Sequence, residues 1–243
     1  MTVRAAALRS LAAVPAVGFA VLAYLWLTLP DVRPLRTQNP STTAFIELRA
    51  DEARERGAKP RRVQRWIGYR HISPDLKRAV LVAEDDAFWQ HEGVDFDQLQ
   101  ESLEKDWAMG RFVRGGSTIT QQLAKNLYLS PSKNPLRKLR EFVIARRLEA
   151  ELKKARILEL YLNVIEWGDG IYGVEAASHA YFSMPAATLG PSESALLAAC
   201  IVNPRIFNPA KPGNRLLKRQ QLILKRMGAI TPPDPVPQPE PQQ

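Results

Sequence analysis

Three successive carboxyl groups, Glu84, Asp85 and Asp86, follow an apolar helical run and are the first candidates for chemistry. Adjacent carboxyl groups repel one another as they ionise, and a helix C-terminus also disfavours negative charge, so one pKa is expected to rise. A carboxyl group with a raised pKa suits a general base. The alternative is a solvated acidic helix end. The aromatic pair beginning at Phe88 favours a shaped site, whereas His91 is expected to be a structural hydrogen-bonding residue.

A glycine pair before a polar helix start is the second candidate, in the segment RGGSTITQQLAKN over residues 114–126. Glycine permits close backbone approach, and the free amides of a helix N-terminus can hold an anion, so the segment predicts a phosphate or pyrophosphate cradle. The lysine and hydroxyl order of a P-loop is absent. A purely structural alternative is a capping box formed by Thr118 and Gln121.

The third candidate is a cationic cluster, Lys133, Arg137 and Lys138, close in sequence to Glu141. Arg137 and Glu141 are one helical turn apart, and an isolated surface pair of this kind contributes only a few tenths of a kcal/mol. If Glu141 instead faces a cleft, the cations would neutralise a leaving pyrophosphate while Glu141 orients or assists it.

Two other features carry no predicted chemistry. Residues 168–173, GDGIYG, fit the dinucleotide-binding spacing, but the preceding segment has helical character, so a glycine-rich connection between helices is expected. The only cysteine, Cys200, lies in an apolar run and is expected to be a buried core residue. A single cysteine excludes an internal disulfide and a cysteine-built metal site, and no metal ligands are predicted.

The length of the chain gives room for one domain. A length of 243 residues accommodates one well-buried domain, a membrane segment and short tails. The net charge of +9 favours an anionic partner. Nucleic acid is not expected, because the basic residues are spread over several helices and no nucleic-acid-binding module is recognisable.

Residues 11–29 carry no charge and would extend about 28 Å as a helix, which is close to the hydrocarbon thickness of a bilayer. They predict a single transmembrane anchor. Arg4 and Arg9 precede the apolar run, so residues 1–10 are expected on the cytoplasmic side and the rest of the chain outside. A cleaved signal peptide is the alternative.

Three further segments complete the predicted organisation: a linker over 30–60 with only a weak helical patch, a catalytic domain over 61–228, and a proline-rich disordered tail over 229–243. The domain is expected to be mainly α-helical, without a large sheet. Proline at helix starts and apolar residues at helical spacing predict helices that begin at Pro74 and Pro135 and that span residues 155–165, 174–182, 191–202 and 215–227.

Four segments in this order, EDDAFWQHEGVD, RGGSTITQQLAKN, RKLREFVIARRLE and ILELYLNVIEWGDGIYGVEAASHAYF, resemble the glycosyltransferase domain of bifunctional penicillin-binding proteins. They resemble the monofunctional biosynthetic peptidoglycan transglycosylases more closely, from about Trp66 to about Met227. The absence of a following transpeptidase region favours the monofunctional branch. The resemblance implies a lysozyme-like, two-lobed helical domain with a groove for glycan chains. Residues 107–113 would fall in the smaller lobe, either dipping into the lipid surface or packing inside the domain.

The activity implied by the resemblance is polymerisation of lipid II. Glu84 would take the proton of the acceptor 4-hydroxyl during an inverting attack that yields a β-1,4 linkage, and Glu141 would be the second catalytic carboxylate. Lys125, Lys133 and Arg137 would stabilise the departing pyrophosphate. The implied substrate-binding residues are Asp85, Phe88, His91, Gly115, Gly116, Ser117, Thr118, Gln121, Gln122, Lys125, Asn126, Lys133, Arg137 and Lys138. Many relatives have arginine where this chain has Asp86 or Lys133.

The implied partners are lipid II, the growing glycan chain and the cytoplasmic (inner) membrane, with cell-wall synthesis or division proteins as further candidates. No tightly bound cofactor is implied, and a divalent cation, Mg²⁺ or Mn²⁺, at the pyrophosphate is left open. Two other functions stay open beside this one. A lytic transglycosylase or lysozyme-like enzyme would also use carboxyl chemistry on glycan. A noncatalytic membrane scaffold would need no chemistry.

Overall fold

The computed structural model describes residues 18–20, 23–24, 27–95, 117–129 and 135–229. Most of the predicted anchor and nearly all of the predicted tail lie outside these ranges, as do residues 107–113, Gly115, Gly116 and Lys133. No helix within the described ranges is both long enough and apolar enough to cross a membrane.

The described part of the chain is mainly α-helical, as predicted. Its helices are α2 (Ala44–Glu55), α3 (Pro74–Glu84), α5 (Ile119–Tyr128), α6 (Pro135–Glu151), α7 (Lys154–Val164), α8 (Val174–Phe182), α9 (Pro191–Cys200) and α10 (Asn214–Arg226). Short 3₁₀ turns are η1 (Arg33–Arg36), η2 (Tyr69–His71), η3 (Ala186–Thr188) and η4 (Met227–Ala229). The predicted helices are confirmed to within two residues at their described ends.

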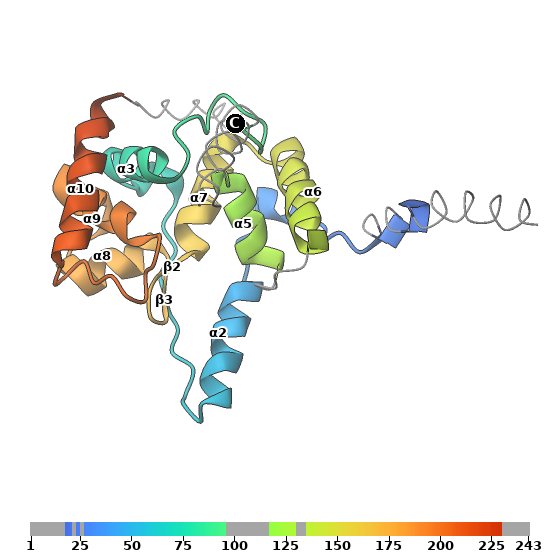
Figure 1. The fold of residues 1–243 in the computed structure, drawn as a ribbon, viewed down its shortest axis with the longest axis horizontal. Helices are drawn as coiled ribbons and strands as arrows, with labels where there is room; N and C mark the ends of the chain where they lie inside the picture. Colours follow the sequence, from blue (N-terminus) through green and yellow to red (C-terminus); the bar gives the residue numbers. More distant parts are fainter. Residues whose placement is uncertain (1–17, 21–22, 25–26, 96–116, 130–134, 230–243) are drawn as a thin grey trace, which may run out of the picture.

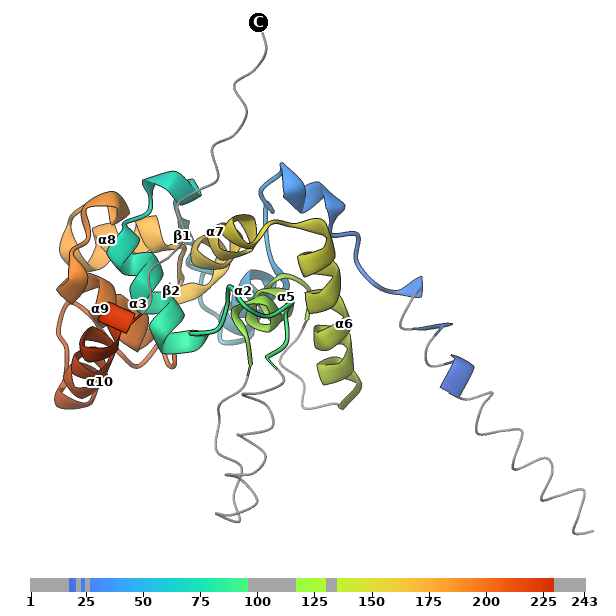
Figure 2. The same ribbon diagram turned by 90° about the horizontal axis from the view of Figure 1, so that it is seen from above.

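The helices form two groups with α7 between them (Figure 1). Helices α3, α9 and α10 contact one another on one side, where α8 also lies, whereas α5 contacts α2, α6 and α7 on the other. The view from above shows the same division (Figure 2). Catalytic candidates from α3, α5 and α6 therefore reach the site from both groups.

Helix α7 is the centre of the packing. Its Ile157, Leu158, Leu160, Tyr161 and Leu162 are all fully buried. A helix that is apolar around most of its circumference must be covered on all sides, which explains its central position. Cys200 at the end of α9 is also fully buried, and burial raises the pKa of its thiol to about 12. The prediction of a buried core cysteine is confirmed.

Helix α2 corrects the expectation of a linker over residues 30–60. The Thr43 hydroxyl caps this helix by accepting a hydrogen bond from Ile46 N at 3.1 Å. Ile46 and Ala53 are buried, and Arg49 forms an ion pair with Glu166 at 3.1 Å. The helix thus packs onto the domain although its sequence is mostly polar, because two apolar contacts and an ion pair attach it.

The glycine-rich segment after α7 forms a hairpin of β2 (Glu166–Gly168) and β3 (Ile171–Tyr172). Strand β3 also pairs in parallel with β1 (Val63–Gln64), giving the sheet order β1-β3-β2. Gly170 has a φ of +67°, and a Cβ there would lie 2.7 Å from Arg61 O. The glycines therefore serve a tight turn between α7 and α8, and the predicted connection between helices is confirmed.

Candidate active site

Glu84 is the last residue of α3 and is only partly exposed. The apolar face of α3, which includes the fully buried Leu76, Ala79 and Val80, fixes the helix against the core. The chain leaves the helix at Asp85, whose extended backbone has a φ of −168°. Glu84 Oε2 accepts a hydrogen bond from Gln122 Nε2 of α5 at 2.9 Å. The candidate base thus lies where the two helix groups meet.

Burial raises the pKa of Glu84 above the ordinary value of a glutamate. The hydrogen bond from Gln122 and the positive charges of Arg219 and Lys125 oppose this rise in pKa, and the negative charge of Asp85 adds to it. A carboxyl group with a raised pKa binds a proton more readily when it is ionised, which is the property that a general base requires. Repulsion from Asp85, expected within the acidic triplet, therefore adds to the raised pKa of Glu84, but less than burial does.

Gln122 is held from two sides. The Tyr161 hydroxyl of α7 donates to Gln122 Oε1 at 2.9 Å, while Gln122 Nε2 faces Glu84 and also lies 3.4 Å from Ser117 O. Asn126, one turn further along α5, donates its side-chain amide to Gln122 O at 2.8 Å. The predicted substrate residues Gln122 and Asn126 are thus parts of one helix face beside Glu84.

Glu141 is buried in α6 and meets two cations. Its Oε2 accepts a hydrogen bond from Arg137 at 2.7 Å, and its Oε1 accepts one from Lys138. Lys138 also donates to the Ser117 hydroxyl at 3.1 Å. Because both oxygens are engaged and only 3% of the residue is exposed, Glu141 orients its cations rather than offering an oxygen of its own to a ligand.

Lys125 of α5 is influenced by the charges of both carboxylates, Glu84 and Glu141. Burial lowers its pKa, Glu141 and Glu84 raise it, and Arg137 and Lys138 lower it further. An ammonium group whose charge is disfavoured by burial and by neighbouring cations gains when an anion arrives. Lys125, Arg137 and Lys138 therefore form a cationic group suited to pyrophosphate, on the side of Gln122 toward α6.

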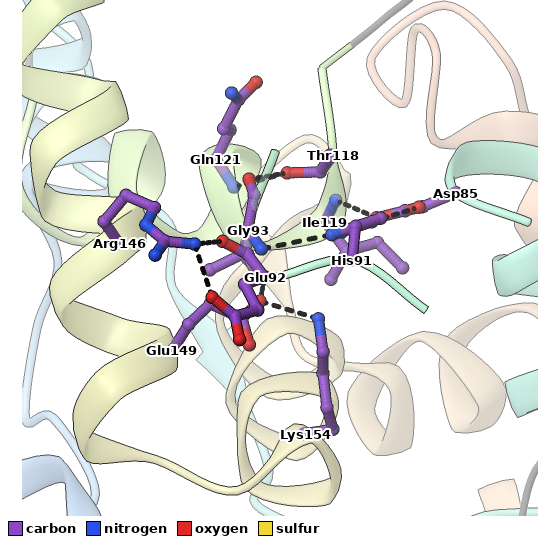
Figure 3. Close-up of polar contacts among 11 residues, drawn as sticks. Asp85, His91, Glu92, Gly93, Thr118, Ile119, Gln121, Arg146, Glu149 and Lys154 are labelled. Carbon is purple, nitrogen blue, oxygen red and sulfur yellow. Dashed lines mark hydrogen bonds and ion pairs between the residues drawn. The ribbon is translucent and has the colours of Figure 1, made fainter. Parts of the chain in front are cut away.

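Asp85 joins the turn after α3 to the start of α5 (Figure 3). Its Oδ2 accepts from Ile119 N at 2.8 Å, and its Oδ1 lies 2.9 Å from His91 Nε2. Gly93 N donates to His91 Nδ1 at 3.1 Å, so the other nitrogen, Nε2, carries the proton that His91 donates to Asp85. These hydrogen bonds agree with the structural role expected of His91, and its contact with substrate stays a prediction.

Thr118 completes this connection (Figure 3). Its hydroxyl donates to Gly93 O at 2.7 Å and accepts from Gln121 N at 3.2 Å. Half of the predicted capping box is therefore formed. The other half is not, because Gln121 Oε1 is buried without a hydrogen-bond partner among the described residues.

Ion pairs on α6 and α7 support the same turn (Figure 3). Arg146 donates to Glu92 O at 2.7 Å, and Glu149 accepts from Lys154 at 2.8 Å and from the Thr120 hydroxyl. The start of α5 and the turn over residues 85–93 are thus attached both to each other and to the neighbouring helices.

Several predicted substrate-binding residues are enclosed rather than exposed. Phe88 is fully buried, with Trp89 edge-on at 5.0 Å and Lys154 over its ring at 4.4 Å, so it packs inside the domain, and its contact with substrate stays a prediction. Asp85, Thr118 and Gln121 are also buried and support the site from behind. The structure brings together Glu84, Ser117, Gln122, Lys125, Arg137, Lys138 and Glu141.

Two residues of the site are not predicted from the sequence. Tyr161 lies in a run whose helical spacing indicates only core packing, and its hydroxyl contact is visible only in the folded chain. Among the described residues, Arg219 of α10 is the charged group that most lowers the pKa of Glu84, and its Nε lies 3.3 Å from Ala199 O. Its distance in sequence from Glu84 hides this electrostatic effect, and no local pattern signals it.

The residues of the site do not form a metal centre. Among the described residues no three His, Cys, Asp or Glu side chains are grouped to hold a metal ion. Both oxygens of Glu141 already accept hydrogen bonds from cations, which compete with a metal for the same lone pairs. The donor set at the cationic group therefore does not fit a protein-held divalent cation.

Comparison with known proteins gives a consistent result. The sequence pattern of the Transglycosylase family matches residues 52–228, which include every described site residue named above. A biosynthetic peptidoglycan transglycosylase of Azoarcus sp. (strain BH72) is 49% identical over 210 residues, which cover 86% of this chain and 90% of that protein. One from Nitrosospira multiformis is 46% identical over 195 residues, covering 80% and 85%, respectively.

Proposed function

We propose that this chain, which belongs to the transglycosylase family, polymerises lipid II into the glycan strands of peptidoglycan. The family membership confirms the resemblance seen in the sequence. The observation that supports this function most directly is the partly buried Glu84 carboxyl group, with a raised pKa, beside a group of cations suited to pyrophosphate.

In the proposed reaction Glu84 acts as the general base. It takes the proton of the acceptor's N-acetylglucosamine 4-hydroxyl while that oxygen attacks the anomeric carbon of the donor. The bond from this carbon to phosphate breaks, and its electron pair leaves with undecaprenyl pyrophosphate. Attack opposite the leaving group inverts the configuration and gives a β-1,4 linkage.

The leaving group is stabilised by Lys125, Arg137 and Lys138, whose charges balance the negative charge that develops on the pyrophosphate. Glu141 holds Arg137 and Lys138 in place, and Ser117 orients Lys138. Lys133, Gly115 and Gly116 are further substrate-binding residues of the proposal. The proposal includes no tightly bound cofactor. A divalent cation would arrive with the pyrophosphate, and no step of the proposed reaction depends on it.

The proposed setting is the outer face of the cytoplasmic membrane. Residues 11–29 anchor the chain with its N-terminus inside, and the domain adopts the lysozyme-like, two-lobed arrangement of the family. The two groups of helices that meet at Glu84 support this arrangement. In this setting the proposed partners are the growing glycan chain and cell-wall synthesis proteins.

The test is polymerisation of labelled lipid II in detergent or liposomes by the full chain, with glycan resolved from precursor on a gel. Glu84→Gln removes the base and keeps the shape of the side chain, so polymer is expected from the wild type and not from this variant. Asp86→Asn is the matched control, because it makes the same chemical change two residues away at an exposed carboxylate.

An inactive wild type under varied lipid and metal conditions would contradict the proposal. Cleavage of preformed glycan by the same preparation would indicate a lytic enzyme, and inactivity toward both substrates would indicate a scaffold. Circular dichroism of each variant shows whether a loss of activity reflects a loss of folding.

A further inference from the structure

Two hydrogen bonds in series connect the central helix of the domain to the Glu84 carboxylate. The Tyr161 hydroxyl of α7 lies 2.9 Å from Gln122 Oε1, and Gln122 Nε2 of α5 lies 2.9 Å from Glu84 Oε2 at the end of α3. Three helices thus meet through one amide group. Among the described residues, Glu84 Oε2 is the only oxygen of this carboxylate that accepts a hydrogen bond.

An ionised Glu84 carboxylate only accepts hydrogen bonds, so Gln122 Nε2 faces it and Gln122 Oε1 is left to accept from Tyr161. Tyr161 is fully buried, and burial raises the pKa of its hydroxyl well above the ordinary value, so the hydroxyl keeps its proton at neutral pH. Its donation to Gln122 Oε1 agrees with this orientation of the amide. The opposite amide orientation would place two acceptors, Oε1 and an ionised Glu84, against each other, and this arrangement costs free energy.

We propose that Tyr161 is a positioning residue for the general base, and that its hydroxyl fixes the Gln122 amide so that Glu84 keeps a hydrogen bond to one oxygen and uses the other. This inference rests on the proposed function. It assigns to Tyr161 no contact with substrate.

The inference has a consequence for protonation. A hydrogen bond that favours the ionised carboxylate opposes the effect of burial, so losing the fixed amide raises the pKa of Glu84 further. Other groups that face Glu84 are Arg219 from α10, Lys125 from α5, the adjacent Asp85 and the Cys200 thiol from α9. All four are retained when only the Tyr161 hydroxyl is removed.

The test is Tyr161→Phe in the full chain, which removes the hydroxyl and keeps the buried ring. We expect kcat to fall about tenfold at neutral pH with little change in KM, and the acid limb of the rate profile to move to higher pH. Tyr172→Phe is the matched control, because the Tyr172 hydroxyl is also buried but has no hydrogen-bond partner among the described residues. Equal effects of the two variants would overturn the inference.

A double-mutant cycle shows whether Tyr161 acts through Gln122. Gln122→Met removes the amide, after which Tyr161→Phe should lower kcat by less than twofold more. Losses that multiply would mean that Tyr161 acts independently of Gln122, and would contradict the inference.

A readout without turnover separates this inference from the proposed function. The pKa of Glu84 is measured by carbon-13 NMR of labelled glutamate carboxyl groups, with the signal assigned by its loss in Glu84→Gln. A higher pKa in Tyr161→Phe than in the wild type supports the positioning role even if lipid II is not polymerised. An unchanged pKa would overturn that role even in an active enzyme.

Discussion

The carboxylates of Glu84 in α3 and Glu141 in α6 have different neighbours. Glu84 accepts one hydrogen bond from a neutral amide, and burial raises its pKa. Glu141 accepts hydrogen bonds from Arg137 and Lys138 on its two oxygens. The first carboxylate can therefore accept a proton, whereas both oxygens of the second are occupied by cationic side chains. A glutamate side chain can therefore act as a base or hold cations in place, depending on its hydrogen-bond partners.

The largest expected effect is the difference in activity between the two variants. Glu84→Gln should lower kcat about a thousandfold, as the loss of a general base does. Glu141→Gln should lower kcat only roughly 10- to 100-fold, because it misplaces cations that remain present. Single-turnover rates on labelled lipid II measure both values. A greater loss in Glu141→Gln would reverse the assigned roles.

The stability of the two variants should change in opposite directions. Glu141→Gln should destabilise the domain by about 1–2 kcal/mol, a value moderated by the partial exposure of Arg137 and Lys138. Glu84→Gln should stabilise it at neutral pH. A raised folded-state pKa means that stability present below the unfolded pKa is lost as the pH rises through the folded pKa, and glutamine avoids this loss.

Urea denaturation at pH 7 and at pH 4 checks these signs. The advantage of Glu84→Gln should be present at pH 7 and largely absent at pH 4, where the wild-type carboxyl group is protonated in the folded state. Two variants that lose stability equally at pH 7 would show that the carboxylates are not in different environments.

A smaller effect is expected at Arg219. Arg219→Gln removes a positive charge that lowers the pKa of Glu84, so the acid limb of the kcat/KM profile should move to higher pH. At mildly acidic pH the rate should fall several-fold, with recovery as the pH increases. Lys218→Gln, an exposed neighbour on α10, is the control. The same shift in both variants would indicate a general charge effect.

The smallest effect is expected at Asp86, which follows the base by two residues. It forms an ion pair with Arg226 at 2.8 Å, and both side chains are substantially exposed. Asp86→Asn should change the free energy of unfolding by less than about 0.5 kcal/mol and leave kcat unchanged. A large loss of activity, measured in the same lipid II assay, would extend the base site to this residue.

The sequence predicts the helices well where residues that mark helix starts agree with the pattern of buried apolar residues. Pro74 and Pro191 stand at observed helix starts, and apolar spacing marks α7 and α8. Helix α2 is harder to predict, because only Ile46 and Ala53 are buried and the rest of its stability comes from contacts with distant residues. Ser73 is the N-cap residue of α3, but its hydroxyl donates to Leu189 O and makes no capping hydrogen bond.

The site is less predictable than the helices. Local sequence identifies Glu84 and Glu141 as chemically capable, and the resemblance assigns their roles and adds Gln122. It does not separate residues that line the site from residues that support it, such as Phe88, because burial depends on how distant helices pack. Tyr161 and Arg219 become visible only when α7 and α10 are placed beside α3 and α5.

The hydrogen bond from Ile119 N to Asp85 joins residues 34 positions apart and has a consequence for how the enzyme can diversify. It closes a loop directly behind the base and directly before the helix that carries Gln122 and Lys125. Because the free-energy cost of closing a loop grows slowly with its length, the intervening segment can gain or lose residues at little thermodynamic cost. The number of residues between Asp85 and Ile119 can therefore differ among relatives, provided that the residues of this segment that support the site are kept, while Asp85 holds Glu84 beside α5.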